Sequence, residues 1–390
     1  MSAAPIALYI HWPFCRKKCP YCDFNSHVPE QTPEAARWLE AYCREFDTLA
    51  NRVGERRIHS IFFGGGTPSL MPPEIVAGVL QHVQTRWPLE PECEITLEAN
   101  PTSAEAGKFR AFREAGVNRL SVGVQSLRAE ALHFLGREHT TEEAMEALRM
   151  ARDIFPRYTF DLIYARPGQT VPEWEQELSE ALALASGHLS LYQLTIEKGT
   201  PFYRAYQDGA FTLPDEDTAA MLYTHTEQML AEAGMVPYEI SNYAAPGQES
   251  RHNLVYWRYG EYLGIGPGAH SRVCLAGDTT PHRLAMMTTH HPERWLQQVA
   301  QRRHGLQDES RVEGRALAEE CLMMGLRLQE GLDAAHFQAI TGQVLERCIA
   351  MPTLEVLCTE GLVHWNGQML RLAPAGRLVL NSILDALLNH

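Results

Sequence analysis

Three cysteines lie close together near the N-terminus with the spacing C-x3-C-x2-C. They are Cys15, Cys19 and Cys22. Three thiolates hold three irons of a [4Fe–4S] cube and leave the fourth iron free, so a small molecule can chelate it through an amine and a carboxylate and receive one electron. A zinc site is the alternative that the spacing leaves open, and its fourth ligand would be His11, Asp23 or His27.

The cysteine segment is basic, whereas the chain as a whole is acidic. Arg16, Lys17 and Lys18 separate the first two cysteines, and these cations favour thiolates and an anionic ligand. The 390 residues include 34 basic and 48 acidic side chains, which gives a net charge of −14. Because this balance opposes the neutralisation of many phosphates, nucleic acid is not expected as a partner.

The other cysteines and the N-terminus indicate a reducing compartment. Six further cysteines are scattered along the chain, and this distribution suits packing residues better than a disulfide framework. They are Cys43, Cys93, Cys274, Cys321, Cys348 and Cys358. The N-terminus does not resemble a signal peptide, and no apolar run approaches the roughly 20 residues that cross a bilayer. We therefore expect a cytoplasmic protein without a membrane span, while peripheral membrane contact and the oligomeric state stay open.

Six segments rich in β-branched, aromatic and aliphatic residues alternate with helical patterns in the first half of the chain. The expected strands are Ile6–His11, Ile58–Phe63, Cys93–Ala99, Arg119–Gln125, Tyr158–Tyr164 and His188–Thr195. Capping-box spacing marks helix starts at Thr102 with Glu105, Thr140 with Glu143 and Thr170 with Glu173. Because parallel strands need a crossover connection, this alternation predicts an α/β fold, a partial (βα)6 TIM-like barrel with its ligands at the carboxyl ends of the strands.

The pattern changes in the last third of the chain. Three helices are expected at Glu313–Gln329, Leu332–Thr341 and Gln343–Glu360, followed by a hairpin over Leu362–Leu372 that turns at Asn366-Gly367. This order indicates a helical, winged-helix-like domain. Residues 311–390 hold nine acidic residues, six Arg and no Lys, so we expect a lid or packing domain rather than a DNA-binding one.

Five further segments carry a resemblance to a known family. They are Tyr9-x-His11-x-Pro13-Phe14-Cys15, Phe63-Gly64-Gly65-Gly66-Thr67-Pro68-Ser69, Glu98-x-Asn100-Pro101, Gly123-Val124-Gln125-Ser126 and Asp161-Leu162-Ile163-Tyr164. Together with the cysteine motif, they resemble the HemN/HemW branch of the radical S-adenosylmethionine (SAM) superfamily. The resemblance runs from about residue 6 to the C-terminus.

This resemblance implies a [4Fe–4S] cluster on the three cysteines and SAM as the ligand of the free iron. The residues implied to contact the cluster-bound SAM are Tyr9, Gly65 and Glu98. A second SAM position would be lined by Tyr21, Gly66, Thr67, Gln125, Arg137 and Asp161. From the residues alone, the glycine turn would let backbone N–H groups approach a carboxylate, and Arg137 could equally be a surface cation at a helix end.

Two functions are compatible with this branch. One is the oxygen-independent coproporphyrinogen III dehydrogenase, which decarboxylates propionate side chains with a 5′-deoxyadenosyl radical. The other is a HemW-like haem chaperone that binds haem and transfers it to an acceptor protein such as a respiratory enzyme. Dehydrogenase members carry a further cysteine two positions after the last ligand, and here that position is Phe24. They also have a long N-terminal segment before the first strand, which is short here, so the chaperone is the expected function.

A second motif points to the chaperone. The segment His252-Asn253-Leu254-Val255-Tyr256-Trp257 resembles the H-N-x-x-Y-W motif of HemW, whose histidine is implicated in haem binding. Imidazole is a common axial ligand of haem iron, and aromatic rings stack on the macrocycle. The implied haem contacts are His252, Asn253, Tyr256 and Trp257. The nearby glycines of Gly264–Gly268 suggest close backbone approach to a ligand.

The expected organisation follows from these features. Residues 1–275 would form the radical SAM barrel that binds the cluster and SAM, residues 276–310 a connecting segment, and residues 311–390 a HemN-type C-terminal domain. The scaffold implies SAM binding and cleavage, whereas dehydrogenase activity on coproporphyrinogen is not expected. Haem is the expected cargo, and no residue is assigned a catalytic role.

Overall fold

The structure, a computed structural model, describes residues 5–277 and 280–388, and its first six strands are those that the sequence predicts. They are β1 (Ile6–Trp12), β2 (Ile58–Gly65), β3 (Leu89–Ala99), β4 (Arg119–Gln125), β5 (Arg157–Tyr164) and β6 (His188–Gln193). Each strand pairs in parallel with the next, in the order β1-β2-β3-β4-β5-β6. Their carboxyl ends therefore meet at one edge of the sheet, as expected for a βα alternation.

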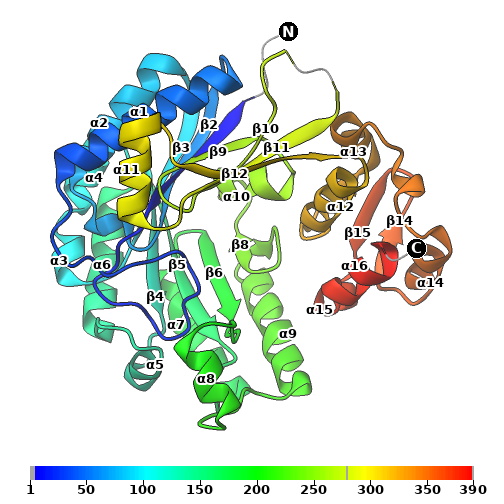
Figure 1. Cartoon of the computed structure of the whole chain (residues 1–390). Helices are drawn as coiled ribbons and strands as arrows, with labels where there is room; N and C mark the ends of the chain where they lie inside the picture. Colours follow the sequence, from blue (N-terminus) through cyan, green and yellow to red (C-terminus); the bar gives the residue numbers. More distant parts are fainter. Residues whose placement is uncertain (1–4, 278–279, 389–390) are drawn as a thin grey trace.

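Helices follow the strands and cover the outer face of the curved sheet (Figure 1). They are α1 (Ala35–Val53), α2 (Pro73–Arg86), α3 (Ser103–Ala106), α4 (Phe109–Ala115), α5 (Ala129–Phe134), α6 (Thr141–Ile154), α7 (Val171–Leu184), α8 (Pro201–Gln207) and α9 (Glu216–Glu232). Helix α1 buries Trp38, Tyr42, Phe46 and Leu49, which recur at helical spacing on one face. Burying each such side chain stabilises the fold by about 1.5–3 kcal/mol.

Local sequence chemistry sets two of the three predicted helix starts. Thr140 and Glu143 form a complete capping box at α6, and Thr170 with Glu173 does the same at α7. Thr102 precedes the short helix α3 without such a box. The Glu105 carboxylate there accepts hydrogen bonds from Asn100 N and from the Ser69 hydroxyl, so it joins two loops instead of capping a helix.

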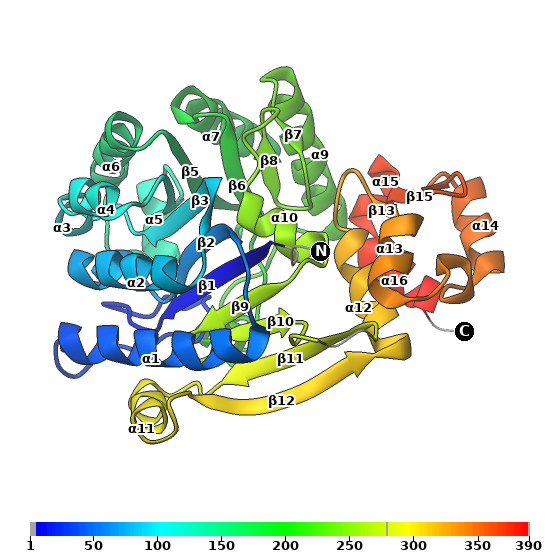
Figure 2. The ribbon, with the colours of Figure 1, turned by 90° about the horizontal axis from the view of Figure 1, so that it is seen from above.

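The sheet continues beyond the six predicted strands. Strand β9 (Tyr262–Ile265) lies parallel to β1, and β10 (His270–Val273), β11 (His282–Thr288) and β12 (Leu306–Glu313) extend that side antiparallel. On the other side, β8 (Asn242–Ala244) and β7 (Val236–Pro237) form the edge. Most of the segment expected to connect two domains, residues 276–310, is thus β11, α11 (Pro292–Arg302) and β12. Figure 2 shows β11 and β12 as a continuation of the sheet.

The C-terminal residues build a separate apolar cluster. Its elements are α12 (Gly314–Gly325), β13 (Leu332–Asp333), α13 (Ala334–Thr341), α14 (Met351–Thr359), β14 (Val363–Trp365), β15 (Met369–Leu372), α15 (Pro374–Leu378) and α16 (Leu380–Leu388). The predicted hairpin is present, and β13 adds a third strand to it. Leu322, Phe337, Leu370 and Ile383 are buried in this cluster. Both views place these elements beside α9 and away from α2 and α4 (Figures 1 and 2).

The inner face of the sheet is polar. Helix α10 (Arg251–Trp257) packs on this side against β2. Buried side chains on this face form hydrogen-bonded groups, such as Ser190 with Asn242 at 2.8 Å and Thr159 with His188 at 2.7 Å. Buried polar side chains are unfavourable unless they are hydrogen bonded. The side chains of this inner layer must therefore bond to one another or to a polar ligand. No helix among the described residues is long and apolar enough to cross a membrane.

Candidate cofactor site

The three thiols lie in one closed loop after β1, which crosses the lower end of the sheet in Figure 1 as the dark-blue segment. The neck of this loop is fixed by two backbone hydrogen bonds, from Cys15 N to His27 O at 2.9 Å and from His27 N to Pro13 O at 2.7 Å. Burial is the main cause that raises the pKa of the Cys15 and Cys22 thiols. In the described part of the chain, no three His, Cys, Asp or Glu side chains stand as a preassembled metal site.

The donors around the sulfurs fit an anionic iron–sulfur cluster. The Thr67 hydroxyl donates to Cys15 Sγ at 3.4 Å, and Arg137 Nη1 donates to Cys19 Sγ at 3.4 Å. Such donors stabilise thiolates and the sulfurs of a cluster. His11, one of the alternative zinc ligands, is instead buried behind the loop, with both ring nitrogens hydrogen bonded to Tyr9 and Asn25. The chemistry of the donor set therefore fits three-thiolate ligation better than a zinc site completed by His11.

The hydroxyl of Tyr9 has a fixed direction. His11 Nε2 donates to the Asn25 carbonyl at 2.9 Å, so its Nδ1 is the acceptor of the Tyr9 hydroxyl at 3.1 Å. Burial lowers the pKa of His11 to about 4, which keeps the ring neutral near pH 7. The oxygen of Tyr9 is thereby left with acceptor capacity, and it lies close enough to the carboxyl group of Glu98 for that group to raise the pKa of Tyr9 further.

Glu98 is the most perturbed carboxyl group of the site. Burial, with a further contribution from Asp161, raises the pKa of Glu98 to about 8. Its Oε2 accepts a hydrogen bond from Gly65 N at 3.3 Å. Burial likewise raises the pKa of Asp161 to about 6. Two neighbouring buried carboxyl groups with raised pKa values are typical of a functional site.

The glycine turn differs from its expected role. Gly65 has a left-handed φ of 115°, and a side chain there would collide with His11, so the position requires glycine. However, Gly66 N donates to Trp12 O at 2.7 Å and Thr67 N donates to Phe14 O at 2.8 Å. These N–H groups hold the glycine turn to β1 and the cysteine loop, and Gly65 N is taken by Glu98. These three N–H groups therefore position the loop in this structure, and none of the three is free for a carboxylate.

Arg137 is part of the site rather than a surface cation. Its Nη2 donates to Asn100 Oδ1 at 2.6 Å and to Gly123 O at 2.8 Å, while Nη1 reaches Cys19. Asn100 in turn donates to the Thr67 hydroxyl at 3.2 Å. Asn100 thus links the loops after β2 and β3 to the connection between α5 and α6, a role that the sequence analysis missed although the residue stands in the quoted Glu98-x-Asn100-Pro101 motif.

The remaining residues of the second expected SAM position line the same end of the sheet. Gln125 ends β4 with a left-handed φ of 69°, a conformation that is costly for a residue other than glycine and that clusters at functional sites. Tyr21 packs beside Phe202, with 6.2 Å between the ring centroids, and burial raises its pKa. The structure thus brings the cysteines, Gly66, Thr67, Arg137 and Tyr21 into one neighbourhood.

The expected haem contacts lie on α10, on the inner side of the sheet. His252 is only 1% exposed, and its Nδ1 and Nε2 are hydrogen bonded to the Ser60 hydroxyl at 2.9 Å and the Tyr256 hydroxyl at 2.8 Å. Burial lowers the pKa of His252 to about 3, so the ring is neutral. Asn253 Nδ2 donates to the Tyr238 hydroxyl at 3.3 Å. The buried Nε1 of Trp257 has no hydrogen-bond partner among the described residues.

The glycines of Gly264–Gly268 and Cys274 lie against neighbouring parts of the protein. A side chain at Gly266 would meet His11 O at 2.5 Å, and one at Gly268 would meet the Asn25 amide at 2.3 Å, so Gly266 approaches β1 and Gly268 approaches the cysteine loop. The Cys274 thiol donates to His282 O at 3.3 Å, and Arg283 Nη1 donates to its sulfur at 3.2 Å. This thiol is satisfied by neighbouring residues, as expected for a packing cysteine.

Comparison with known proteins decides the family. The radical SAM superfamily profile matches residues 9–181, and the HemN C-terminal domain profile matches residues 312–379. A mouse (Mus musculus) protein named radical S-adenosyl methionine domain-containing protein 1, mitochondrial, is 42% identical over 98% of this chain and 87% of its own length. The protein named heme chaperone HemW of Escherichia coli is 37% identical over 98% of both chains. The chain belongs to the radical SAM superfamily, in its HemN/HemW branch.

A solved structure confirms the predicted α/β fold of this radical SAM protein. The E. coli coproporphyrinogen III oxidase HemN superposes with a TM-score of 0.82 over 98% of this chain and 90% of that chain, at 23% sequence identity. At this identity the likeness shows the fold alone. The family implies a [4Fe–4S] cluster and SAM, and the chemistry around Cys15, Cys19 and Cys22 is consistent with both.

Proposed function

We propose that this radical SAM protein is a haem chaperone that binds haem and passes it to an acceptor protein. The observation that carries the proposal is the near full-length similarity to several bacterial proteins named heme chaperone HemW, at 32–37% identity. Phe24 supports it, because this position is exposed and apolar here, whereas dehydrogenase members of the branch carry a cysteine. Some relatives are named as mitochondrial proteins, so the proposal does not include a cellular compartment.

The residues proposed to hold the cofactors are those that the family resemblance implies. Cys15, Cys19 and Cys22 would hold the cluster, and a bound cluster with SAM supplies one-electron chemistry at the open iron. Tyr9, Gly65 and Glu98 would contact the SAM on that iron, with Tyr9 and Glu98 accepting from its amine. A second SAM position would use the remaining predicted residues. These are Tyr21, Gly66, Thr67, Gln125, Arg137 and Asp161.

The haem contacts would be His252, Asn253, Tyr256 and Trp257. The neutral imidazole of His252 is the form that ligates iron. Its Nε2 becomes available only when Tyr256 releases it, since the hydroxyl occupies that nitrogen at 2.8 Å. Tyr256 and His252 are one helical turn apart on α10, and both side chains are buried, so the Tyr256 hydroxyl must move away before Nε2 is free. Ligation at this place therefore requires a local opening of the inner layer.

Haem titration of the anaerobically reconstituted protein tests this proposal. We expect stoichiometric haem uptake, weaker uptake by His252→Ala, and uptake at least as strong as wild type by Tyr256→Phe, because that change removes the competing hydroxyl. Haem should then move to an added apo-acceptor, for which apomyoglobin is a convenient probe. Equal uptake by wild type and His252→Ala would remove His252 from the haem site, and no uptake by the wild type would refute the chaperone.

The alternative function is the coproporphyrinogen III dehydrogenase of the same branch, and the match of residues 312–379 to the HemN C-terminal domain is compatible with it. The same reconstituted protein is incubated with SAM, a reductant and coproporphyrinogen III. The proposal predicts that no protoporphyrinogen forms. Turnover would establish the dehydrogenase despite Phe24.

A further inference from the structure

The side chain of Asn25, three residues after the last cysteine, makes contacts that no cofactor role explains. Asn25 Nδ2 donates to Pro267 O and to His290 O, each at 3.0 Å. Because both partners are carbonyl oxygens, the amide orientation is fixed and Oδ1 accepts from His27 Nε2 at 3.1 Å. One short side chain thus ties the cysteine loop to two segments more than 240 residues away in the sequence.

The backbone of the same residue reaches the SAM side of the site. Asn25 O accepts from His11 Nε2 at 2.9 Å, and this bond fixes His11 Nδ1 as the acceptor of the Tyr9 hydroxyl. If the loop moved away, His11 would lose the bond that selects its tautomer. Tyr9 would then be free to donate toward Glu98 instead of accepting from an amine. The position of Asn25 and the direction of the Tyr9 hydroxyl are therefore linked.

The partner segments are built to receive Asn25. Gly268 has a left-handed φ of 76°, and a methyl group there would come within 2.3 Å of Asn25 Nδ2. Gly268 N donates to Thr289 O at 3.0 Å, so the two receiving segments are themselves joined. Neighbouring Gly266 N is held by the buried carboxylate of Glu45 at 2.8 Å. The two carbonyl acceptors are thus held in place before Asn25 binds them.

We infer that Asn25 is a positioning residue that clasps the cysteine loop against residues 267 and 290 and, through His11, orients the Tyr9 hydroxyl for the ligand. The inference rests on the cluster and SAM site of the proposed function and is independent of haem. It predicts that losing the Asn25 donor weakens two properties together: retention of the cluster and affinity for SAM.

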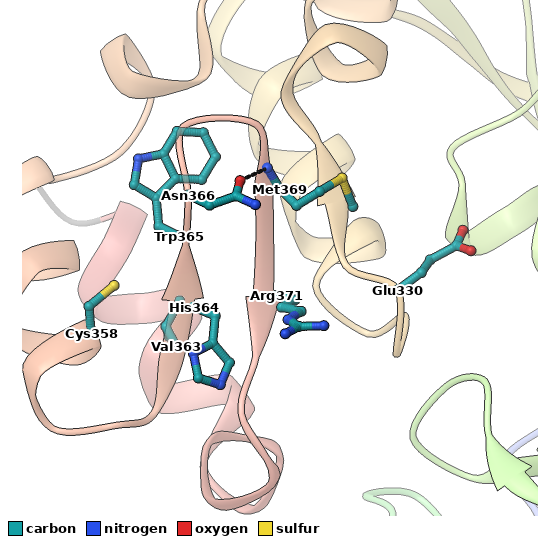
Figure 3. A pocket seen from close by; sticks show the side chains of 8 residues that line it. All are labelled: Glu330, Cys358, Val363, His364, Trp365, Asn366, Met369 and Arg371. Carbon is teal, nitrogen blue, oxygen red and sulfur yellow. Dashed lines mark hydrogen bonds between the residues drawn. The ribbon is translucent and has the colours of Figure 1, made fainter.

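The decisive variant is Asn25→Asp, which keeps the shape and places an oxygen against two carbonyl oxygens. Asn25→Ala removes the side chain without that repulsion. Asn366→Ala is the matched control, because Asn366 Oδ1 also orders a loop by accepting from Gln368 N and Met369 N, but in the β14–β15 hairpin (Figure 3). The two alanine variants therefore remove the same amide group from two different loops.

The measurements are the decay of the cluster absorbance in the presence of an iron chelator and the Kd of SAM, on reconstituted full-length protein. We expect Asn25→Asp to lose its cluster roughly tenfold faster or more and to bind SAM roughly tenfold more weakly, as the loss of two hydrogen bonds implies. Asn25→Ala should change both in the same direction by less, and Asn366→Ala should match the wild type. Unchanged decay and Kd in Asn25→Asp, or equal changes in Asn366→Ala, would overturn the clasp. A wild-type chain that assembles no cluster would instead refute the cofactor assignment itself.

Discussion

At the scale of single residues, the site is dominated by groups that are held in one protonation state. His11 and His252 are kept neutral by burial, and Glu98 is pushed toward its protonated form. For Glu98 the folded pKa of about 8 lies far above the value near 4.3 expected in an unfolded chain. The folded protein therefore binds a proton that the unfolded chain releases between these two pH values, and its stability falls as pH rises through that window.

We predict that Glu98→Gln stabilises the cofactor-free protein, and that the gain grows with pH between about 5 and 8 by at most ~1.4 kcal/mol per pH unit. Above pH 8 the gain should level off, because Glu98 is then ionised in both states. Urea unfolding of wild type and Glu98→Gln at several pH values measures this difference in the free energy of unfolding. Glu130→Gln, which changes an exposed carboxylate on α5, is the control and should show no such trend. A constant difference across the pH range would contradict the prediction.

At the scale of elements, the cysteine loop depends on segments far along the chain. Residues 262–305 supply β9, the glycine segment and α11, and Glu45 of α1 joins them. Its carboxylate accepts from Gly266 N at 2.8 Å, Gly305 N at 2.7 Å and Trp295 Nε1 at 3.0 Å. Burial raises the pKa of Glu45 to about 7, in spite of these three donors. The carboxylate thus fixes the backbone of these segments, which accept the hydrogen bonds of Asn25. We call them the platform.

Glu45→Ala would leave three buried donors without an acceptor. We predict that it lowers the free energy of unfolding by roughly 3 kcal/mol or more, since each unsatisfied buried group costs about 1–3 kcal/mol. Glu40→Ala, five residues away on α1 and exposed, removes the surface ion pair with Arg44 and should cost less than about 1 kcal/mol. Denaturant unfolding of both variants measures the difference, and equal costs would show that the Glu45 network does not stabilise the platform.

The six parallel strands and the hairpin at Asn366 were predictable, because alternation, capping residues and turn residues are local signals. The role of Asn25 and the platform from residues 262–305 were not, because they depend on contacts between residues more than 200 positions apart. Arg137 shows the same limit: its spacing after Gln125 fits a surface cation equally well. Only the folded chain shows its guanidinium between Cys19 and Asn100.

At the scale of the whole molecule, the sheet and the C-terminal cluster form two cores joined by ionic contacts. Glu320 of α12 accepts from Tyr259 at 2.6 Å and from Arg272 at 3.0 Å, and Arg377 of α15 pairs with Glu227 of α9 at 2.7 Å. The C-terminal elements therefore border both ends of the sheet, with α12 beside β10–β12 and α15 beside α9 (Figures 1 and 2). The cysteine loop, where SAM and the cluster would bind, lies on the side of the molecule away from the C-terminal elements (Figure 1).

The most direct test of the account is electron paramagnetic resonance of the reconstituted, one-electron-reduced protein with and without SAM. Three-thiolate ligation predicts about four irons and four sulfides per chain. It also predicts that SAM changes the signal by binding the free iron. Cys19→Ser should lose both the cluster and the signal while its fold is retained. Zinc in place of iron, or a cluster whose signal does not respond to SAM, would contradict it.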